Sequence, residues 1–469
     1  MPRPRARTTR SRRSIPALAA LLYVLAAGGP AAANPSSCAT DQPPAPSPRI
    51  VHGSLGGLAY NVLLPTGYAS SGRRYPVLYL LHALQYNENT WLALTDVEEL
   101  TAPFTGRQAA IVVMPDGGPG GWYTNWPDGT EQWERYHMRH LIPAIDQRFR
   151  TVADRAHRAV AGFSMGGIGA LAYAARHPDL FVATGGFSAL AHITIPEDAY
   201  RGAPASNPRT DAGSPGPRSA GRPRPPYRTP DDAKSGCDNG SNQWGDRNSD
   251  ATNWHGHNPT DLVSNLRGAT VYVASGNGTP CDPLDPVDRP TIIEPGDAGT
   301  LVMSQDFAAA AENAHVPVTT DFYGCGVHTM RYAERDLHRF WPLMTKAFGS
   351  RAPAAFDYRS TEPDFWVWGW AFHADTQRAP EFLEVRGVSK NGFTLTGSGT
   401  ENVVTGRLFA PGRRVAVTGA LPAVARAGRK GRLRLRVDLG PAHTEKQFTP
   451  TDSHPDFVTR IVRLRPLHG

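Results

Sequence analysis

The sequence lacks most of the features that mark membrane-spanning, metal-dependent and nucleic-acid-binding proteins. Beyond the first 33 residues, no apolar run approaches the roughly 20 residues that a membrane helix needs. Two common metal-binding patterns, HExxH and CxxC, are both missing, so we expect no metal and no other cofactor. The middle of the chain is mildly acidic and basic residues gather towards its two ends, which argues against a nucleic-acid partner.

Length and composition indicate a globular protein with more than one domain. The chain has 469 residues, of which 40% are hydrophobic and 47 are Gly, which suits two or three domains.

Cysteine is scarce. The four cysteines, Cys38, Cys237, Cys281 and Cys325, allow three disulfide pairings, and their spacing alone does not choose among them.

Residues 1–33 have the three-part pattern of a secretory signal peptide. A cationic stretch is followed by a largely apolar one and then by three alanines at residues 31–33, which suit cleavage. Residues 34–49, rich in Pro and Ser, have the composition of a linker. We therefore expect an exported protein, secreted or associated with the cell wall; a disordered basic arm is the alternative.

Residues 50–350 alternate short buried strands with helical segments. Apolar or β-branched runs predict strands at residues 75–81, 109–114, 157–163 and 269–274, and helical spacing marks residues 133–149 and 166–177. This alternation predicts an α/β domain with a central, mostly parallel sheet and helices on both faces. Residues 201–240, rich in Pro and Arg, break the pattern and are expected to form an exposed insertion.

Residues 353–469 have a different pattern. Alternating segments such as residues 393–396, 414–417 and 432–437, punctuated by Gly and Pro, predict a small antiparallel β-domain. The aromatic run at residues 365–370 allows two interpretations. These rings more often form the core of a small sandwich, and the alternative is that they stack on sugars.

The pentapeptide Gly162-Phe163-Ser164-Met165-Gly166 fits the G-x-S-x-G pattern of a nucleophile elbow. The pattern is weak by itself, but here an expected strand ends at Phe163 and an expected helix begins at Gly166. Such a turn lifts a serine hydroxyl out of the edge of the sheet. Ser164 is therefore the candidate nucleophile, and a Gly-rich structural turn is the alternative.

A serine hydroxyl needs a base and an acid before it reacts, in the chain order Ser, acid, His for this type of elbow. His328 lies in a Gly-rich loop between an expected strand and an expected helix, and Asp282 follows the strand at residues 269–274. If acid and base meet, Cys281 and Cys325 are also close. Of the three pairings, Cys281 with Cys325 is therefore the one that we expect.

An oxyanion hole needs two backbone N–H donors near the nucleophile. One is expected from Met165, directly after Ser164, and the other from Leu84, in the loop after the strand at residues 75–81.

These motifs together resemble the putative-esterase (esterase D-like) family of α/β-hydrolases. The matching segments are LLHALQYNENTW (80–91), VVMPDGGPGGWYTNW (112–126), AGFSMGGIGALAYAARHPDLF (161–181) and GVHTMRY (326–332). Within that family the chain is similar to the antigen 85 mycolyltransferase branch, through WHGHNPTDLVSNL (254–266) and VYVASGNGTPCD (271–282).

The resemblance implies an α/β-hydrolase fold and an acyl-enzyme mechanism that needs no metal. It implies Ser164 as nucleophile, His328 as base and Asp282 as acid, with Leu84 and Met165 as oxyanion donors. By the same resemblance, the side chains expected to contact the substrate are His82, Gln85 and Trp126.

We expect an exported serine esterase or acyltransferase that acts on acyl esters of lipids or sugars. Its substrate would be an acyl-ester lipid or glycolipid, and a cell-wall glycan is a candidate further partner. Two alternatives remain: a catalytically silent cell-wall-binding protein on a hydrolase scaffold, and a metal hydrolase that uses His255 and His257.

Overall fold

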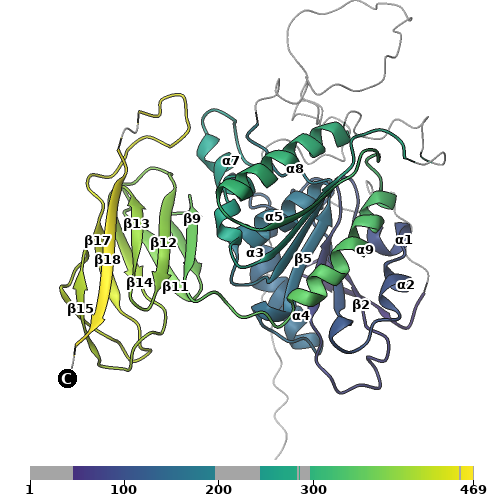
Figure 1. The fold of residues 1–469 in the computed structure, drawn as a ribbon, viewed down its shortest axis with the longest axis horizontal. Coiled ribbons are helices and arrows are strands. Elements are labelled where there is room, and N and C mark those ends of the chain that lie inside the picture. Colours follow the sequence, from purple (N-terminus) through teal and green to yellow (C-terminus); the bar gives the residue numbers. More distant parts are fainter. Residues whose placement is uncertain (1–45, 196–242, 282–284, 286–295, 454–455, 468–469) are drawn as a thin grey trace, which may run out of the picture. The chain divides into compact units, whose positions relative to one another are not determined.

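A computed structural model of the chain describes residues 46–195, 243–281, 285, 296–453 and 456–467. Its first part is an eight-stranded sheet in the order β1-β2-β4-β3-β5-β6-β7-β8, drawn in purple to green in Figure 1. The strands are β1 (Ile50–Leu55), β2 (Leu58–Leu63), β3 (Val77–Leu81), β4 (Ile111–Pro115), β5 (Arg158–Phe163), β6 (Ala183–Phe187), β7 (Thr270–Ser275) and β8 (Val318–Phe322).

The strands β3 to β8 run parallel to one another, whereas β2 pairs antiparallel with β4 and β1 pairs antiparallel with β2 at one edge. Every residue of β3, β4, β5 and β6 is buried, as expected for parallel strands covered on both faces. The strands predicted at residues 75–81, 109–114, 157–163 and 269–274 all form. The α/β-hydrolase fold class is confirmed.

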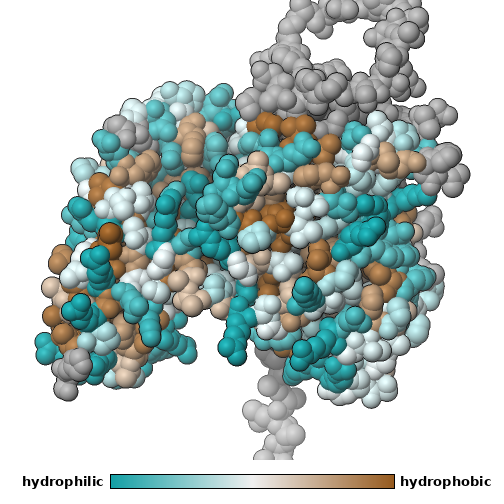
Figure 2. All heavy atoms as spheres, in the orientation of Figure 1, coloured by the Kyte–Doolittle hydropathy of each residue, from teal (hydrophilic) through white to brown (hydrophobic). Residues whose placement is uncertain are grey.

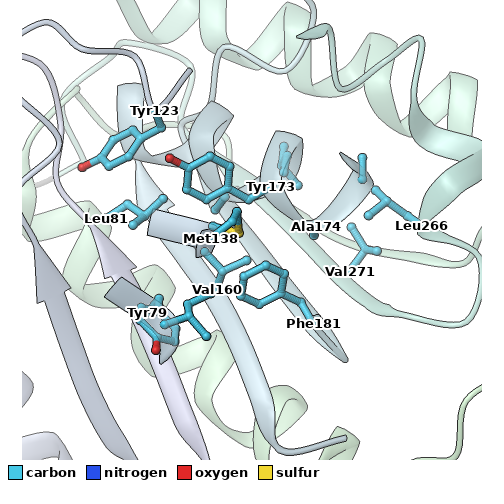
Figure 3. Packing of buried hydrophobic residues seen from close by; sticks show 14 of the residues in the cluster. Tyr79, Leu81, Tyr123, Met138, Val160, Tyr173, Ala174, Phe181, Leu266 and Val271 are labelled. Carbon is cyan, nitrogen blue, oxygen red and sulfur yellow. The ribbon is translucent and has the colours of Figure 1, made fainter. Parts of the chain in front are cut away.

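Helices cover both faces of the sheet. They are α1 (Thr90–Leu94), α2 (Val97–Thr101), α3 (Trp133–Tyr136), α4 (Ile142–Arg148), α5 (Met165–Arg176), α7 (Ala251–His257), α8 (Gly296–Asn313) and α9 (Met330–Ala347). Residues of α4, α5 and α8 pack on one face, and residues of α1, α2 and α9 pack on the other. Figure 3 shows part of the first cluster, where the rings of Tyr123 and Tyr173 lie edge to face, with centroids 6.1 Å apart.

The segment predicted as one helix at residues 133–149 is divided in the structure. A π turn, His137–Leu141, separates α3 from α4. Pro143 lies in the first turn of α4. Because proline has no N–H to donate to the preceding turn, it suits a helix start and not a helix interior.

The C-terminal strands form two antiparallel sheets. The four-stranded sheet has the order β10-β11-β14-β17, and the six-stranded sheet has the order β16-β15-β18-β13-β12-β9. The strands are β9 (Phe356–Ser360), β10 (Asp364–Val367), β11 (Trp370–Ala374), β12 (Leu383–Ser389), β13 (Gly392–Gly397), β14 (Thr400–Val404), β15 (Arg414–Thr418), β16 (Val424–Arg426), β17 (Arg434–Asp438) and β18 (Val458–Pro466).

Both sheets contribute alternate residues to one apolar core, which makes this part of the chain a β-sandwich. In β17, for example, Leu435 and Val437 are buried while Arg434, Arg436 and Asp438 are exposed. The predicted antiparallel β-domain is confirmed. The division of the chain near residue 350 stays a prediction; α9 ends at Ala347 and β9 begins at Phe356.

The predicted signal peptide at residues 1–33, most of the linker at residues 34–49 and the insertion at residues 201–240 lie outside the described residues. Within the described part of the chain, no helix has both the length and the apolar character to cross a membrane. On the face drawn in Figure 2, hydrophilic side chains predominate and apolar ones occur in small groups.

Candidate functional site

The turn between β5 and α5 has the backbone geometry of a nucleophile elbow. Ser164 sits there with φ 56° and ψ −115°, outside the regions that L-residues favour. Its N–H donates to the carbonyl oxygen of Phe187 at 2.9 Å, which ties the turn to β6. A non-Gly residue held in this conformation is costly, so it indicates a functional position.

Two glycines allow this turn to pack tightly. A Cβ on Gly166 would lie less than 3.0 Å from the carbonyl oxygens of Leu81 and His82 at the end of β3. A Cβ on Gly162 would meet the backbone of Gly166 in the same way. The N-terminus of α5 therefore rests directly on the backbone of the strand end.

Aromatic side chains fix the two carbonyl groups that Gly166 contacts. The indole of Trp91 donates to Leu81 O at 3.0 Å, and the hydroxyl of Tyr123 donates to His82 O at 3.0 Å. Leu84 and Met165, the expected oxyanion donors, follow this strand end and Ser164 respectively. Both pack on the same apolar cluster.

His82, one of the predicted substrate contacts, is buried between the loops after β3 and β4, and its contact with substrate stays a prediction. Its side chain is 1% exposed. The N–H of Gly117 donates to its Nε2 at 2.8 Å, so Nδ1 carries the ring proton and donates to Ala83 O at 2.8 Å. Because both nitrogens already bond backbone groups, the neutral ring holds the loops after β3 and β4 together.

The other two predicted substrate contacts also brace loops. Trp126 is buried, and its indole donates to Gly121 O at 3.4 Å. Gln85 is half-buried with φ 63°, and its N–H donates to Pro119 O at 2.7 Å. Substrate contact by Gln85 or Trp126 stays a prediction.

His328 lies beside the nucleophile turn. Its half-buried ring packs on that of Phe163, the residue before Ser164, with centroids 4.5 Å apart and planes inclined at 33°. Ser164 and His328 are 164 positions apart in the chain, and the parallel order of β5, β6, β7 and β8 brings their strand ends to one edge of the sheet.

The loop that carries His328 is joined to the loop after β7. The predicted disulfide between Cys281 and Cys325 is present, with Cα atoms 5.1 Å apart. The N–H of Gly278 donates to Gly326 O at 2.9 Å, and the Asn277 amide donates to Gly324 O at 2.6 Å. The loop after β7 and the loop that carries His328 are therefore held together by a disulfide and by hydrogen bonds.

The candidate acid, Asp282, lies outside the described residues. A second carboxylate nearby is described and was missed in the sequence. Asp285 is 3% exposed, and its Oδ2 accepts hydrogen bonds from Cys281 N–H at 2.8 Å and from the Tyr332 hydroxyl at 2.5 Å. Partial burial and this bond to Asp285 raise the pKa of Tyr332 to about 12.

An apolar cluster adjoins the elbow and was also missed in the sequence. Ile168, one helical turn after Ser164, packs in a group with Leu190, Ile193, Trp244, Trp254 and Met303. The ring of Trp122 packs against this group, 5.5 Å from Trp244. Trp122 is far in sequence from Trp244 and Trp254, so no local signal could have grouped it with them.

The two histidines considered as metal ligands do not form a ligand cluster. His255 Nδ1 bonds Asp261 at 2.7 Å and its ring stacks on Phe448, while His257 is buried near Glu134. Among the described residues, no group of three or more His, Cys, Asp or Glu is arranged to hold a metal ion.

The buried side chain of His137 holds the loop after β4 through a hydrogen bond. The carbonyl oxygen of Asp116 can only accept, so His137 Nε2 donates to it, at 2.9 Å. Nδ1 then accepts from the Tyr173 hydroxyl at 2.8 Å. Burial lowers the pKa of His137 to about 4, so the ring stays neutral near pH 7.

Comparison with known proteins assigns this part of the chain to a family. The family model described as putative esterase matches residues 57–340. An esterase of Mycobacterium tuberculosis (strain H37Rv) is 43% identical over 140 residues, which cover 28% of this chain and 29% of that protein. The chain therefore spans less than a third of the length of the first curated relatives that it matches.

A more distant relative and a solved structure also match the chain. The diacylglycerol acyltransferase/mycolyltransferase Ag85A of Mycobacterium gordonae is 32% identical over 133 residues, covering 26% of this chain and 38% of that protein. The crystal structure of MPT51 from Mycobacterium tuberculosis is 20% identical, with a TM-score of 0.47, covering 65% of this chain and 99% of that one.

The packing of Gly166 predicts that Gly166→Ala destabilises the protein by about 2–3 kcal/mol, because a methyl group there meets backbone that cannot move aside. Gly299→Ala in α8 is the control, since nothing lies within 4 Å of its Cβ position and alanine favours a helix. Urea unfolding measures both. Equal midpoints for the two variants would contradict the tight contact.

The low pKa of His137 predicts a loss of stability in mild acid. Between pH 6.5 and about 4 the unfolded chain binds a proton that the folded chain excludes. Stability present above pH 6.5 is therefore lost as pH falls, by about 3 kcal/mol at pH 4.

His137→Phe should be less stable than wild type at pH 7, because Asp116 O and the Tyr173 hydroxyl lose their partner. It should also lose less stability between pH 7 and pH 4.5. Exposed His140 provides the control His140→Gln. Urea unfolding at both pH values is the measurement, and an unchanged pH dependence in His137→Phe would count against the assignment.

Proposed function

The chain belongs to the putative esterase family, and from that premise we propose that it is a serine ester hydrolase or acyltransferase with Ser164 as nucleophile. The observation that supports the proposal is the contact of the ring of His328, the proposed base, with Phe163, the residue before the strained Ser164.

The proposed reaction proceeds through an acyl-enzyme. Ser164 Oγ attacks the ester carbonyl carbon as His328 takes its proton, and the N–H groups of Met165 and Leu84 stabilise the oxyanion. His328 then gives the proton to the leaving alcohol. Water or a sugar hydroxyl attacks the acyl-enzyme with the same base assistance and restores the free serine.

Two carboxylates lie in the loop that supports His328, and we assign them different roles. Asp282 is the proposed acid, which orients His328 and stabilises its protonated form. Asp285 is the proposed positioning residue, because it already accepts bonds from Cys281 N–H and from Tyr332 on α9. Those bonds hold the loop against the helix that begins two residues after His328.

The proposed substrate is an acyl ester of a lipid or a sugar. The apolar cluster that includes Ile168 is itself buried, so a hydrocarbon chain would contact its partly buried neighbours Trp122 and Val302. Export through a cleaved N-terminal signal peptide is part of the proposal. It is supported by the tripartite sequence of residues 1–33 and by the disulfide, which suits an oxidising compartment.

Replacement of the nucleophile tests the proposal. Ser164→Ala should lower kcat for p-nitrophenyl butyrate hydrolysis at least about 10³-fold, because no hydroxyl remains to form the acyl-enzyme. Ser188→Ala is a matched control, since Ser188 is equally buried, at 2%, and also has a positive φ after a strand. Equal measurable activity of wild type and Ser164→Ala would refute Ser164 as the nucleophile, and a wild type without activity would instead favour the catalytically silent, wall-binding alternative.

A second set of variants separates the two carboxylates. Asp282→Asn should lower kcat by about 10³–10⁴-fold, as expected when the acid that orients a catalytic histidine is neutralised. Asp285→Asn and Tyr332→Phe should each lower kcat by less than about 30-fold, and to a similar extent, because they break the same bond. If Asp285→Asn is as inactive as Ser164→Ala while Asp282→Asn stays active, Asp285 is the acid.

A further inference from the structure

The outer face of the four-stranded sheet carries an exposed indole among hydrogen-bonding side chains. Along β10, Phe365 and Val367 point into the sandwich core, so Asp364 and Trp366 lie on the outside. Trp366 is 54% exposed. Phe448 is the other exposed aromatic residue in the described part of the chain, but its ring is stacked on His255 at 3.8 Å.

Strand register places polar side chains in a row next to this indole. Asp364 pairs with His373 of β11, His373 pairs with Asn402 of β14, and Asn402 pairs with Arg436 of β17. Directly paired side chains on antiparallel strands lie about 5 Å apart on the same face. The row therefore offers hydrogen-bond acceptors and donors at a regular spacing across the sheet.

The next row begins with Trp366 and contains small side chains. Trp366 pairs with Ala371, and Ala371 pairs with Val404, which pairs with Arg434. Because Ala371 and Val404 are short, the indole stands above its neighbours. An exposed aromatic ring beside a row of polar side chains suits a ligand that has a flat apolar face and a rim of hydroxyl groups.

Contacts with its neighbours hold the indole in position. His373 Nδ1 bonds Asp364 Oδ1 at 2.7 Å, and the His373 ring meets that of Trp366 edge to face, with centroids 5.4 Å apart. A side chain that is fixed before binding loses less conformational entropy when a ligand arrives.

A cavity of 390 Å³ opens beside this indole. Trp366 and Asp364 line it together with Asn125, Gln132, Arg135 and Arg139. Arg135, Arg139, Asp364 and Trp366 are all exposed. The volume falls within the range of small-molecule sites, about 300–1,000 Å³, and the lining offers charged and amide groups of both hydrogen-bonding senses.

We propose that this face of the sandwich is a carbohydrate-binding site, in which a sugar ring stacks on Trp366. A pyranose has one face of C–H bonds, which suits the indole, and a rim of hydroxyls, which suits the row from Asp364 to Arg436. A lipid or an apolar protein surface would need a larger apolar area than one indole with Ala371 and Val404. The row has one carboxylate, Asp364, at one end and one guanidinium, Arg436, at the other, so these two charges balance along the row.

The test is affinity electrophoresis of the full chain in gels that contain arabinogalactan, xylan or dextran. At least one polysaccharide should retard the wild-type protein, and Trp366→Ala should bind that polysaccharide at least about tenfold more weakly. Trp366→Phe, which keeps an aromatic ring, should retain intermediate binding. Ile461→Ala should bind like wild type, because Ile461 is also 54% exposed but lies on β18 of the other sheet.

Hydrolysis of p-nitrophenyl butyrate is measured on the same samples, and all three variants should match wild type. Retained hydrolysis shows that the catalytic part is folded, and the far-UV circular dichroism spectrum checks the sandwich. The proposal is overturned if none of the three polysaccharides retards the wild type, or if Trp366→Ala is retarded as strongly as wild type. Neither result bears on the esterase proposal, which depends on Ser164.

Discussion

Everything at the candidate site depends on one close approach of two backbone segments. The N-terminus of α5 can rest on the carbonyl groups at the end of β3 only because Gly166 has no side chain. That contact sets the turn in which Ser164 is strained. Trp91 and Tyr123 hold the same carbonyl groups from the other side, so the strain is balanced by surrounding packing and hydrogen bonds.

The second half of the site is assembled by topology and then secured. His328 and the loop after β7 follow neighbouring parallel strands, whose carboxyl ends meet at the edge where Ser164 lies. A disulfide and backbone hydrogen bonds then join the two loops. The position of His328 therefore depends little on loop freedom, which suits the proposed base of a serine hydroxyl.

The C-terminal sandwich shows how the same aromatic run can serve two purposes. Alternation along β10 and β11 puts Phe365 and Trp370 in the core and leaves Trp366 outside. Both interpretations of this run were open from the sequence, and each describes different residues within it. One ring stabilises the fold, and its neighbour is available to a ligand.

The sequence by itself determined the elements whose signals are local. Buried runs marked the strands, and the Gly-x-Ser-x-Gly turn marked the nucleophile. The order of motifs along the chain singled out His328 and the Cys281–Cys325 pair. Only the tertiary structure decided that His82 is enclosed by backbone groups, and that Asp285 bonds Tyr332. It alone grouped Trp122 with Trp244 and put Trp366 beside His373. Those contacts join residues that are distant in the chain or lie on paired strands, so they depend on packing and register, which composition and periodicity do not encode.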